Sequence, residues 1–157
     1  MDKKAIEIVL GADHGGFSLR QDLIPWLEGL GVVVSDLGAF SYNATDDYPD
    51  FAKAVGLHVL SRKGIKGIII CGSGVGASIA ANKIAGVRAA ICHDSYSSHQ
   101  GVEHDDMNVL CLGARVVGVE LAKEIITSFI SADFSGEERH CRRLNKVLTI
   151  ESSPHTT

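Results

Sequence analysis

The sequence predicts a doubly wound α/β fold of the Rossmann-like type, with a five-stranded parallel sheet, helices on both faces and an additional C-terminal helix. Five short runs are apolar throughout instead of alternating with polar residues, as is typical of strands buried on both faces. Segments with helical periodicity follow most of these runs, as in consecutive βαβ units. The length of 157 residues, with 45% hydrophobic and 22% charged residues, fits one globular domain.

The five apolar runs are the predicted strands. They cover residues 5–10, 32–37, 66–70, 87–92 and 108–112. Each run ends in glycine or polar residues, so a turn is expected at each carboxyl end. Because parallel strands place their carboxyl ends at one edge of the sheet, these turns are expected to converge on one ligand.

Helical stripes of apolar residues predict the helices. The first covers residues 17–30, where Pro25 removes a backbone donor and is expected to kink it. Pro49 can open the second helix, which continues to Val59. Further helices are predicted from the glycine-rich loop to about Ala85, over 120–130, and over 137–150, whereas we assign no helix to the polar stretch 93–106.

Residues 1–150 are expected to form the single domain, and residues 151–157 a disordered tail. The formal net charge of −4 gives no reason to expect a nucleic acid or an anionic membrane as the partner. A basic cluster near the C-terminus suits a small anionic ligand better. It consists of Arg139, Arg142, Arg143 and Lys146.

The sequence predicts a cytoplasmic protein. It contains no run of roughly 18 apolar residues that could span a membrane, and its N-terminus lacks a signal-peptide pattern. The four cysteines show no paired spacing, which favours a reducing compartment over a disulfide framework. Cys92 and Cys111 lie inside apolar runs and are expected to be buried core residues.

The stretch 68–82, IIICGSGVGASIAAN, carries the strongest functional signal. It indicates a strand, a tight turn with three glycines (Gly72, Gly74 and Gly76), and the start of a helix. Such a turn directs backbone N–H groups outward at the positive end of a helix dipole, where they can hold an anion. Cys71 and Ser73 lie in this field, which favours the thiolate form of the cysteine and makes the loop a candidate reaction centre.

The glycine loop also fits a dinucleotide-binding fingerprint. Gly72, Gly74 and Ala77 match G-x-G-x-x-G/A, and Asp94 follows about 20 residues later at the end of the next strand. Against this interpretation, the chain has no room for a separate substrate domain. Pyrophosphate binding also does not require a cysteine next to a hydroxyl. A dinucleotide-binding protein therefore remains an alternative hypothesis.

Six segments in this order and spacing resemble the sugar-phosphate isomerases of the ribose-5-phosphate isomerase B type. They are GADHGGF, DDYPDF, CGSGVGASIAANK, HDDMNVL, GARVVGVELAK and ERHCRRL, and together they cover about residues 6–150. The resemblance implies a homodimer or tetramer with active sites at the subunit interface and no metal or organic cofactor. It also implies interconversion of ribose 5-phosphate and ribulose 5-phosphate.

The resemblance assigns roles residue by residue. Cys71 is similar to the base that moves a proton between C1 and C2, and Ser73 supplies the hydroxyl, usually a threonine, that assists proton movement between the two substrate oxygens. His104 is similar to the residue that opens the furanose ring. The other matches resemble sugar or phosphate contacts. These are Asp13, His14, Asn108, Arg115, Arg139 and Arg143.

Two departures from the family pattern affect this reading. Relatives without the cysteine use a glutamate five or six residues later, but Ala77 and Ser78 occupy that region here, which leaves Cys71 as the base. Asp105 stands where asparagine is common, and an ionised acid cannot donate a hydrogen bond. An isomerase of allose or galactose 6-phosphate therefore stays open, as does a non-catalytic sugar-phosphate sensor.

Overall fold

The computed structural model describes residues 5–154 of the chain. Within them lies a five-stranded sheet with the order β2-β1-β3-β5-β4, in which every pairing is parallel. The strands are β1 (Glu7–Ala12), β2 (Val33–Asp36), β3 (Lys66–Cys71), β4 (Ala89–Ile91) and β5 (Val109–Gly113). The predicted sheet is confirmed, and each strand boundary lies within about two residues of its predicted position.

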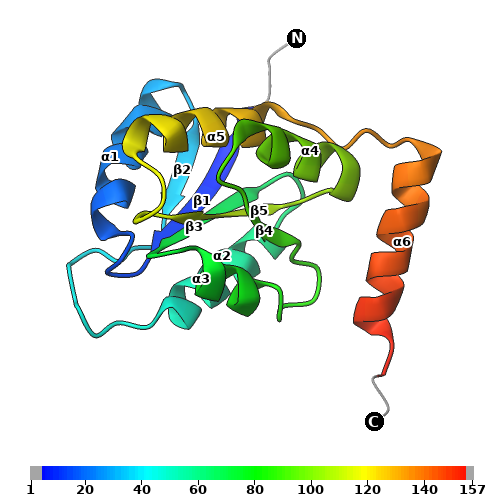
Figure 1. Ribbon diagram of the computed structural model, residues 1–157, viewed down its shortest axis with the longest axis horizontal. Helices are drawn as coiled ribbons and strands as arrows, with labels where there is room; N and C mark the ends of the chain where they lie inside the picture. The colour runs from blue at the N-terminus through cyan, green and yellow to red at the C-terminus, as the bar shows by residue number, and fades with distance from the viewer. Residues whose placement is uncertain (1–4, 155–157) are drawn as a thin grey trace.

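Helices cover both faces of the sheet (Figure 1). Within the described residues they are α1 (Phe17–Gly29), α2 (Tyr48–Leu60), α3 (Val75–Ala81), α4 (Ser95–Asp105), α5 (Val119–Ser131) and α6 (Glu138–Ser152). One core lies under α1, α4 and α5, where Leu23, Ile125 and Phe129 are fully buried. The other lies under α2 and α3, where Val55 and Ala77 are fully buried.

The order of the strands creates a switch point at the centre of the sheet. From β1 the chain adds β2 on one side and then crosses to β3 on the other side of β1. Ligands of open α/β sheets bind at the carboxyl ends of strands at such a point. Asp13 and Cys71 lie there, at the ends of the paired strands β1 and β3.

Helix α4 was not predicted, because its buried side is nearly free of large apolar residues. Ser98 and Val102 are its buried residues, and the Ser98 hydroxyl donates a hydrogen bond to the Ile125 carbonyl at 2.9 Å. The helix begins at a polar cap, in which the Asp94 carboxylate accepts from the Ser97 N–H at 2.6 Å. This bond stabilises the carboxylate and lowers the pKa of Asp94.

Helix α3 ends at Ala81, about one turn before the predicted end. The Asn82 side chain binds both the N–H and the carbonyl of Ala89, at 2.9 and 2.8 Å. This pair of bonds ties the end of the helix to the start of β4. By contrast, α1 continues past Pro25 to Gly29.

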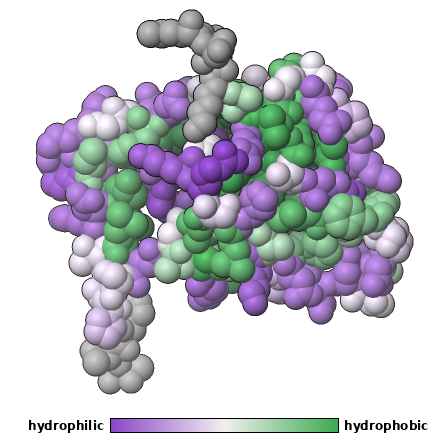
Figure 2. Space-filling model, turned by 180° about the vertical axis from the view of Figure 1, so that it is seen from behind, coloured by the Kyte–Doolittle hydropathy of each residue, from purple (hydrophilic) through white to green (hydrophobic). Residues whose placement is uncertain are grey.

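Helix α6 projects beyond the sheet and the helices that cover it (Figures 1 and 2). The element that it chiefly contacts is α4. Helix α6 extends through Ser152, so the first two residues of the predicted tail are helical. Residues 155–157 of that tail lie outside the described part of the chain. Among residues 5–154, no helix combines the length and apolar character needed to cross a membrane.

Candidate active site

The glycine loop places the Cys71 thiol at the carboxyl end of β3. Cys71 is 5% exposed, and its Sγ accepts a hydrogen bond from the Gly74 N–H at 3.1 Å. Gly74 precedes α3 with a φ of 82°, a left-handed conformation that favours glycine. The predicted order of strand, turn and helix is therefore confirmed, and a backbone donor faces the sulfur.

The thiol lines a pocket of about 330 Å³ together with several predicted site residues. The lining consists of Asp13, Tyr48, Cys71, Gly72, Ser73, Gly76, Arg115 and Val116. The β5–α5 turn supports this pocket, because the Ala114 and Arg115 N–H groups donate to the Cys71 and Gly72 carbonyls at 2.9 and 3.0 Å. Segments far apart in the sequence thus converge here, as the parallel topology predicts.

Two glycines are required by close packing around the pocket. A Cβ on Gly76 would lie 2.6 Å from the ring of Tyr48, and a Cβ on Gly113 would lie 2.6 Å from the backbone of Ser73. Sequence reasoning did not identify Tyr48, although it lies in the DDYPDF motif. Its role depends on the contact with Gly76, which no sequence pattern marks.

Asp13 and His14 follow β1 as predicted. The Asp13 carboxylate is buried and accepts hydrogen bonds from the Gly15 and Gly16 N–H groups at 2.9 and 3.2 Å. His14 instead binds the Asp46 carboxylate, through its backbone N–H at 2.9 Å and its Nδ1 at 2.7 Å. The hydrogen bond to Asp46 raises the pKa of His14 above the ordinary 6.5.

Asp13, His14 and Asp46 also form a set of potential metal ligands. Their ligand atoms all lie within 4.8 Å of one another. The His14–Asp46 hydrogen bonds account for two members of the set, and the bonds to Gly15 and Gly16 account for the third. We therefore interpret these residues as a fixed polar wall next to the Cys71 pocket.

His104 lies on the other edge of the sheet, because α4 runs antiparallel to the strands. One strand length, on the order of 15 Å, separates the two edges. The His104 ring is stacked on the ring of His140 from α6, with 4.0 Å between centroids. A single chain therefore does not bring His104 to Cys71.

Arg139 and Arg143 lie on α6, four residues apart and both exposed. Arg139 donates to Glu137 at 2.9 Å, whereas Arg143 makes no ion pair with any residue in 5–154. The spacing of four places both side chains on one side of the helix, as predicted. They too are remote from the Cys71 pocket within one chain.

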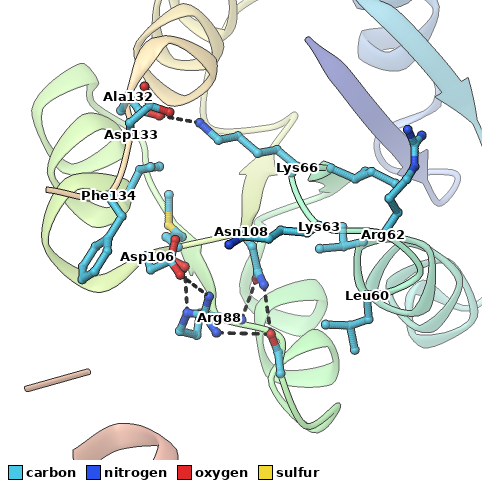
Figure 3. A pocket seen from close by; sticks show the side chains of 16 residues that line it. Leu60, Arg62, Lys63, Lys66, Arg88, Asp106, Asn108, Ala132, Asp133 and Phe134 are labelled. Carbon is cyan, nitrogen blue, oxygen red and sulfur yellow. Dashed lines mark hydrogen bonds and ion pairs between the residues drawn. The ribbon is translucent and has the colours of Figure 1, made fainter. Parts of the chain in front are cut away.

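The structure gives Asn108 a structural role. Its side-chain oxygen accepts from the Arg88 N–H at 2.7 Å, and its amide donates to the Gly86 carbonyl at 2.9 Å. These bonds fix the segment before β4. This segment lines a pocket of about 540 Å³ at the amino-terminal edge of the sheet, where Arg88 also pairs with Asp106 (Figure 3). The expected substrate contact at Asn108 is therefore not included in the proposed site.

Asp94 does not lie where a dinucleotide-binding site needs an acidic residue. Asp94 follows β4, which is separated from β3 by β5, and its carboxylate caps α4. In the dinucleotide fold, the corresponding acid ends the strand next to the glycine loop. The G-x-G-x-x-A spacing therefore reflects the tight approach of the loop to β5 and not a nucleotide site.

Two further cysteines, Cys92 and Cys111, are buried. Burial raises the pKa of Cys92 to about 11 and raises that of Cys111 further, because an apolar core disfavours the thiolate. Both lie in the core, as predicted. Their environments are consistent with packing and not with catalysis.

Comparisons with known proteins show which family the chain resembles. Residues 8–147 match the sequence model of the family described as Ribose/Galactose Isomerase. Ribose-5-phosphate isomerase B of Escherichia coli (strain K12) is 45% identical over 145 residues, which are 92% of this chain and 96% of that protein. D-erythrulose-4-phosphate isomerase of Pectobacterium atrosepticum is 40% identical over 134 residues, which are 83% of this chain and 86% of that protein.

A solved structure shows the same fold with a sugar phosphate present. The crystal structure of ribose-5-phosphate isomerase B from Mycoplasma genitalium with bound ribulose-5-phosphate is 37% identical to this chain, with a TM-score of 0.89. The match covers 94% of this chain and 97% of that chain. The agreement extends over nearly the whole sequence, and the chain therefore belongs to the ribose/galactose isomerase family.

Proposed function

We propose that this protein interconverts ribose 5-phosphate and ribulose 5-phosphate, with Cys71 as the acid–base residue. The observation that carries the proposal is the position of the Cys71 thiol, which lines the switch-point pocket and accepts a hydrogen bond from the Gly74 N–H. Backbone donors stabilise a thiolate relative to a thiol. Membership of the family and the ribulose-5-phosphate bound to a relative support the choice of substrate.

The reaction needs one base and a site for negative charge. Starting from the open-chain aldose, the Cys71 thiolate removes the proton from C2, and an enediolate forms over C1 and C2. The thiol returns the proton to C1, while the Ser73 hydroxyl moves a proton from O2 to O1. The N–H groups of the loop 72–76 that bind neither the Cys71 sulfur nor the Ser73 hydroxyl would hold the enediolate oxygen. One well-placed donor of this kind contributes on the order of 3 kcal/mol.

A second copy of the chain completes the proposed site. The Cys71 pocket holds the reacting carbons, whereas His104, Arg139 and Arg143 would arrive from the partner to open the ring and bind the phosphate. Exposed apolar residues near both halves support self-association. They are Val75 and Ile79 on α3, and Val147 and Ile150 on α6, all at least 50% exposed. A groove of about 680 Å³ between α6 and the body offers further apolar surface.

A homodimer is the smallest assembly with this arrangement, and two dimers could pair as a tetramer. Sedimentation of the purified protein measures the state directly. A monomer at working concentration with full activity would contradict the shared site. We also place the protein in the cytoplasm, supported by four free cysteines, and assign it neither nucleic acid nor membrane as a partner.

The choice between a pentose phosphate and a hexose phosphate as the substrate needs its own test. Asp105, next to His104, is exposed and offers only acceptor atoms when ionised, so its contact with a substrate hydroxyl differs from that of asparagine. The kcat/KM values for ribose 5-phosphate, allose 6-phosphate and galactose 6-phosphate decide between the pentose and hexose readings. We expect the pentose to be preferred, and a higher value for either hexose would overturn that choice.

The reaction class has an independent test. Purified protein with EDTA present is expected to form ribulose 5-phosphate from ribose 5-phosphate without added NAD, because every proposed step uses groups of the protein. Pentose phosphates are also expected to raise the melting temperature. Stabilisation by NAD but not by pentose phosphates would favour the dinucleotide hypothesis. Stabilisation by pentose phosphates without turnover would favour a sugar-phosphate sensor.

A further inference from the structure

A second histidine lies in contact with His104. His140, in the first turn of α6, is only 1% exposed, and its ring stacks on His104 with 4.0 Å between centroids and 26° between planes. Its Nδ1 lies 2.6 Å from the Ser135 hydroxyl oxygen. Its Nε2 is buried and has no hydrogen-bond partner among the described residues.

Packing alone does not explain an imidazole at position 140. A buried ring nitrogen without a partner carries a desolvation cost, so an apolar ring would be the better choice for a core. The imidazole does provide an anchor through Ser135. The Ser135 N–H donates to the Glu103 carbonyl at 2.9 Å, and the Ser135 hydroxyl accepts from the Glu137 N–H at 3.2 Å. Ser135 thereby ties the His140 ring to the end of α4 and the start of α6.

The contacts of His104 define its chemistry. Its Nδ1 lies 3.1 Å from the Gln100 amide nitrogen, which can only donate. The neutral His104 ring therefore carries its proton on Nε2. The His104 side chain is partly exposed. Gln100 fixes one atom of the ring, and the stacked face of His140 restricts rotation of the ring plane.

We propose that His140 is a positioning residue, which holds the His104 ring so that its Nε2–H reaches the furanose oxygen of the substrate. This inference rests on the proposed function, in which His104 opens the ring. In that step an O1 lone pair forms the C1=O1 bond while the C1–O4 bond breaks, and the electron pair of the broken bond takes the proton from Nε2 onto O4. The O1 hydroxyl proton passes to Nε2 in the same step, so the His104 ring stays neutral and the open-chain aldehyde results.

The two substrates separate this step from the isomerisation. Ribose 5-phosphate is a furanose and must be opened before Cys71 can act. Ribulose 5-phosphate cannot close such a ring, because its O5 carries the phosphate. A defect confined to the orientation of His104 therefore slows the reaction of ribose 5-phosphate more than that of ribulose 5-phosphate.

The test compares initial rates from both substrates for His140→Leu, Ser135→Ala and His104→Ala. We expect His140→Leu to lower kcat for ribose 5-phosphate by about 10-fold or more, and the rate from ribulose 5-phosphate by less than about threefold. Ser135→Ala, which keeps the ring and removes its anchor from an exposed loop position, is expected to show the same selectivity at about threefold. His99→Ala, an exposed histidine on α4, is the matched control.

The outcomes separate the positioning role of His140 from the proposed ring-opening role of His104. If His104→Ala lowers both rates equally, His104 does not open the ring, and the proposed function loses that step. If His104→Ala is selective while His140→Leu and Ser135→Ala lower both rates equally or change neither, His140 has no positioning role. If His140→Leu does not fold, Ser135→Ala decides alone, and an equal effect on both substrates overturns the inference.

Discussion

The two groups of proposed site residues are supported in opposite ways. Around Cys71, the backbone of the switch point does the positioning. The residue is 5% exposed, and its Sγ accepts a hydrogen bond from the Gly74 N–H. Arg139 and Arg143 are exposed side chains on α6, a helix that projects from the body (Figure 1). The first group is ordered by the fold of one chain, whereas the second needs another surface to become a site.

This difference predicts how each half contributes to the reaction. Donors that are fixed before substrate arrives can stabilise charge as it develops, so the Cys71 half is expected to govern kcat. Long exposed cations bind a phosphate that does not react, so the α6 half is expected to govern substrate binding. Substitutions in the two halves test this division.

The largest effect is expected for Cys71→Ala. The other carboxylate of the pocket, Asp13, is held by the Gly15 and Gly16 N–H groups and is not expected to replace the thiol as the base. The kcat value should therefore fall by about 1,000-fold or more while ribulose 5-phosphate still binds. Steady-state kinetics and calorimetric titration measure the two quantities. Cys141→Ala removes a thiol from α6 and is the control. Appreciable turnover by the Cys71 variant would mean that the base lies elsewhere.

A smaller effect, on the other half, is expected for Arg143→Ala. The loss of one charged hydrogen bond to phosphate should raise KM by about 10- to 100-fold, with a lesser change in kcat. Arg142→Ala is the matched control, because Arg142 lies one position away and pairs with Glu138 at 3.1 Å. An unchanged KM for Arg143→Ala would remove that residue from the phosphate site.

The smallest effect concerns His14 and pH. Because Asp46 raises the pKa of His14, the ion pair stabilises the fold fully below the ordinary value of 6.5 and is lost as the pH rises through the raised value. Asp46→Asn should therefore lower the NMR titration midpoint of His14 and remove this pH dependence of stability. A midpoint that does not change would show that Asp46 does not control His14.

The sequence predicted the Cys71 half well, because its signals are local. An apolar strand, three glycines and a helix start in one stretch define the loop, and parallel topology places Asp13 and Arg115 beside it. Tyr48 was missed because its role depends on a contact with Gly76 that has no pattern in the sequence. The same is true of the Asp46 carboxylate that binds His14.

In the half that contains His104, several structural features have no local sequence pattern. Helix α4 is held by a polar cap and a buried serine, so no apolar stripe marked it. Asn108 follows His104 closely in sequence, but its amide serves the backbone before β4. The contact between His104 and His140 joins two helices and is visible only once α6 is placed on α4.

Each active site is expected to combine the Cys71 half of one chain with the His104 half of another. Two inactive variants, Cys71→Ala and His104→Ala, can be co-expressed with different tags and purified as the mixed dimer. One of its two sites then has both halves intact, so we predict about half of the wild-type activity from ribose 5-phosphate per dimer. Activity no higher than that of the separate variants would contradict the shared site.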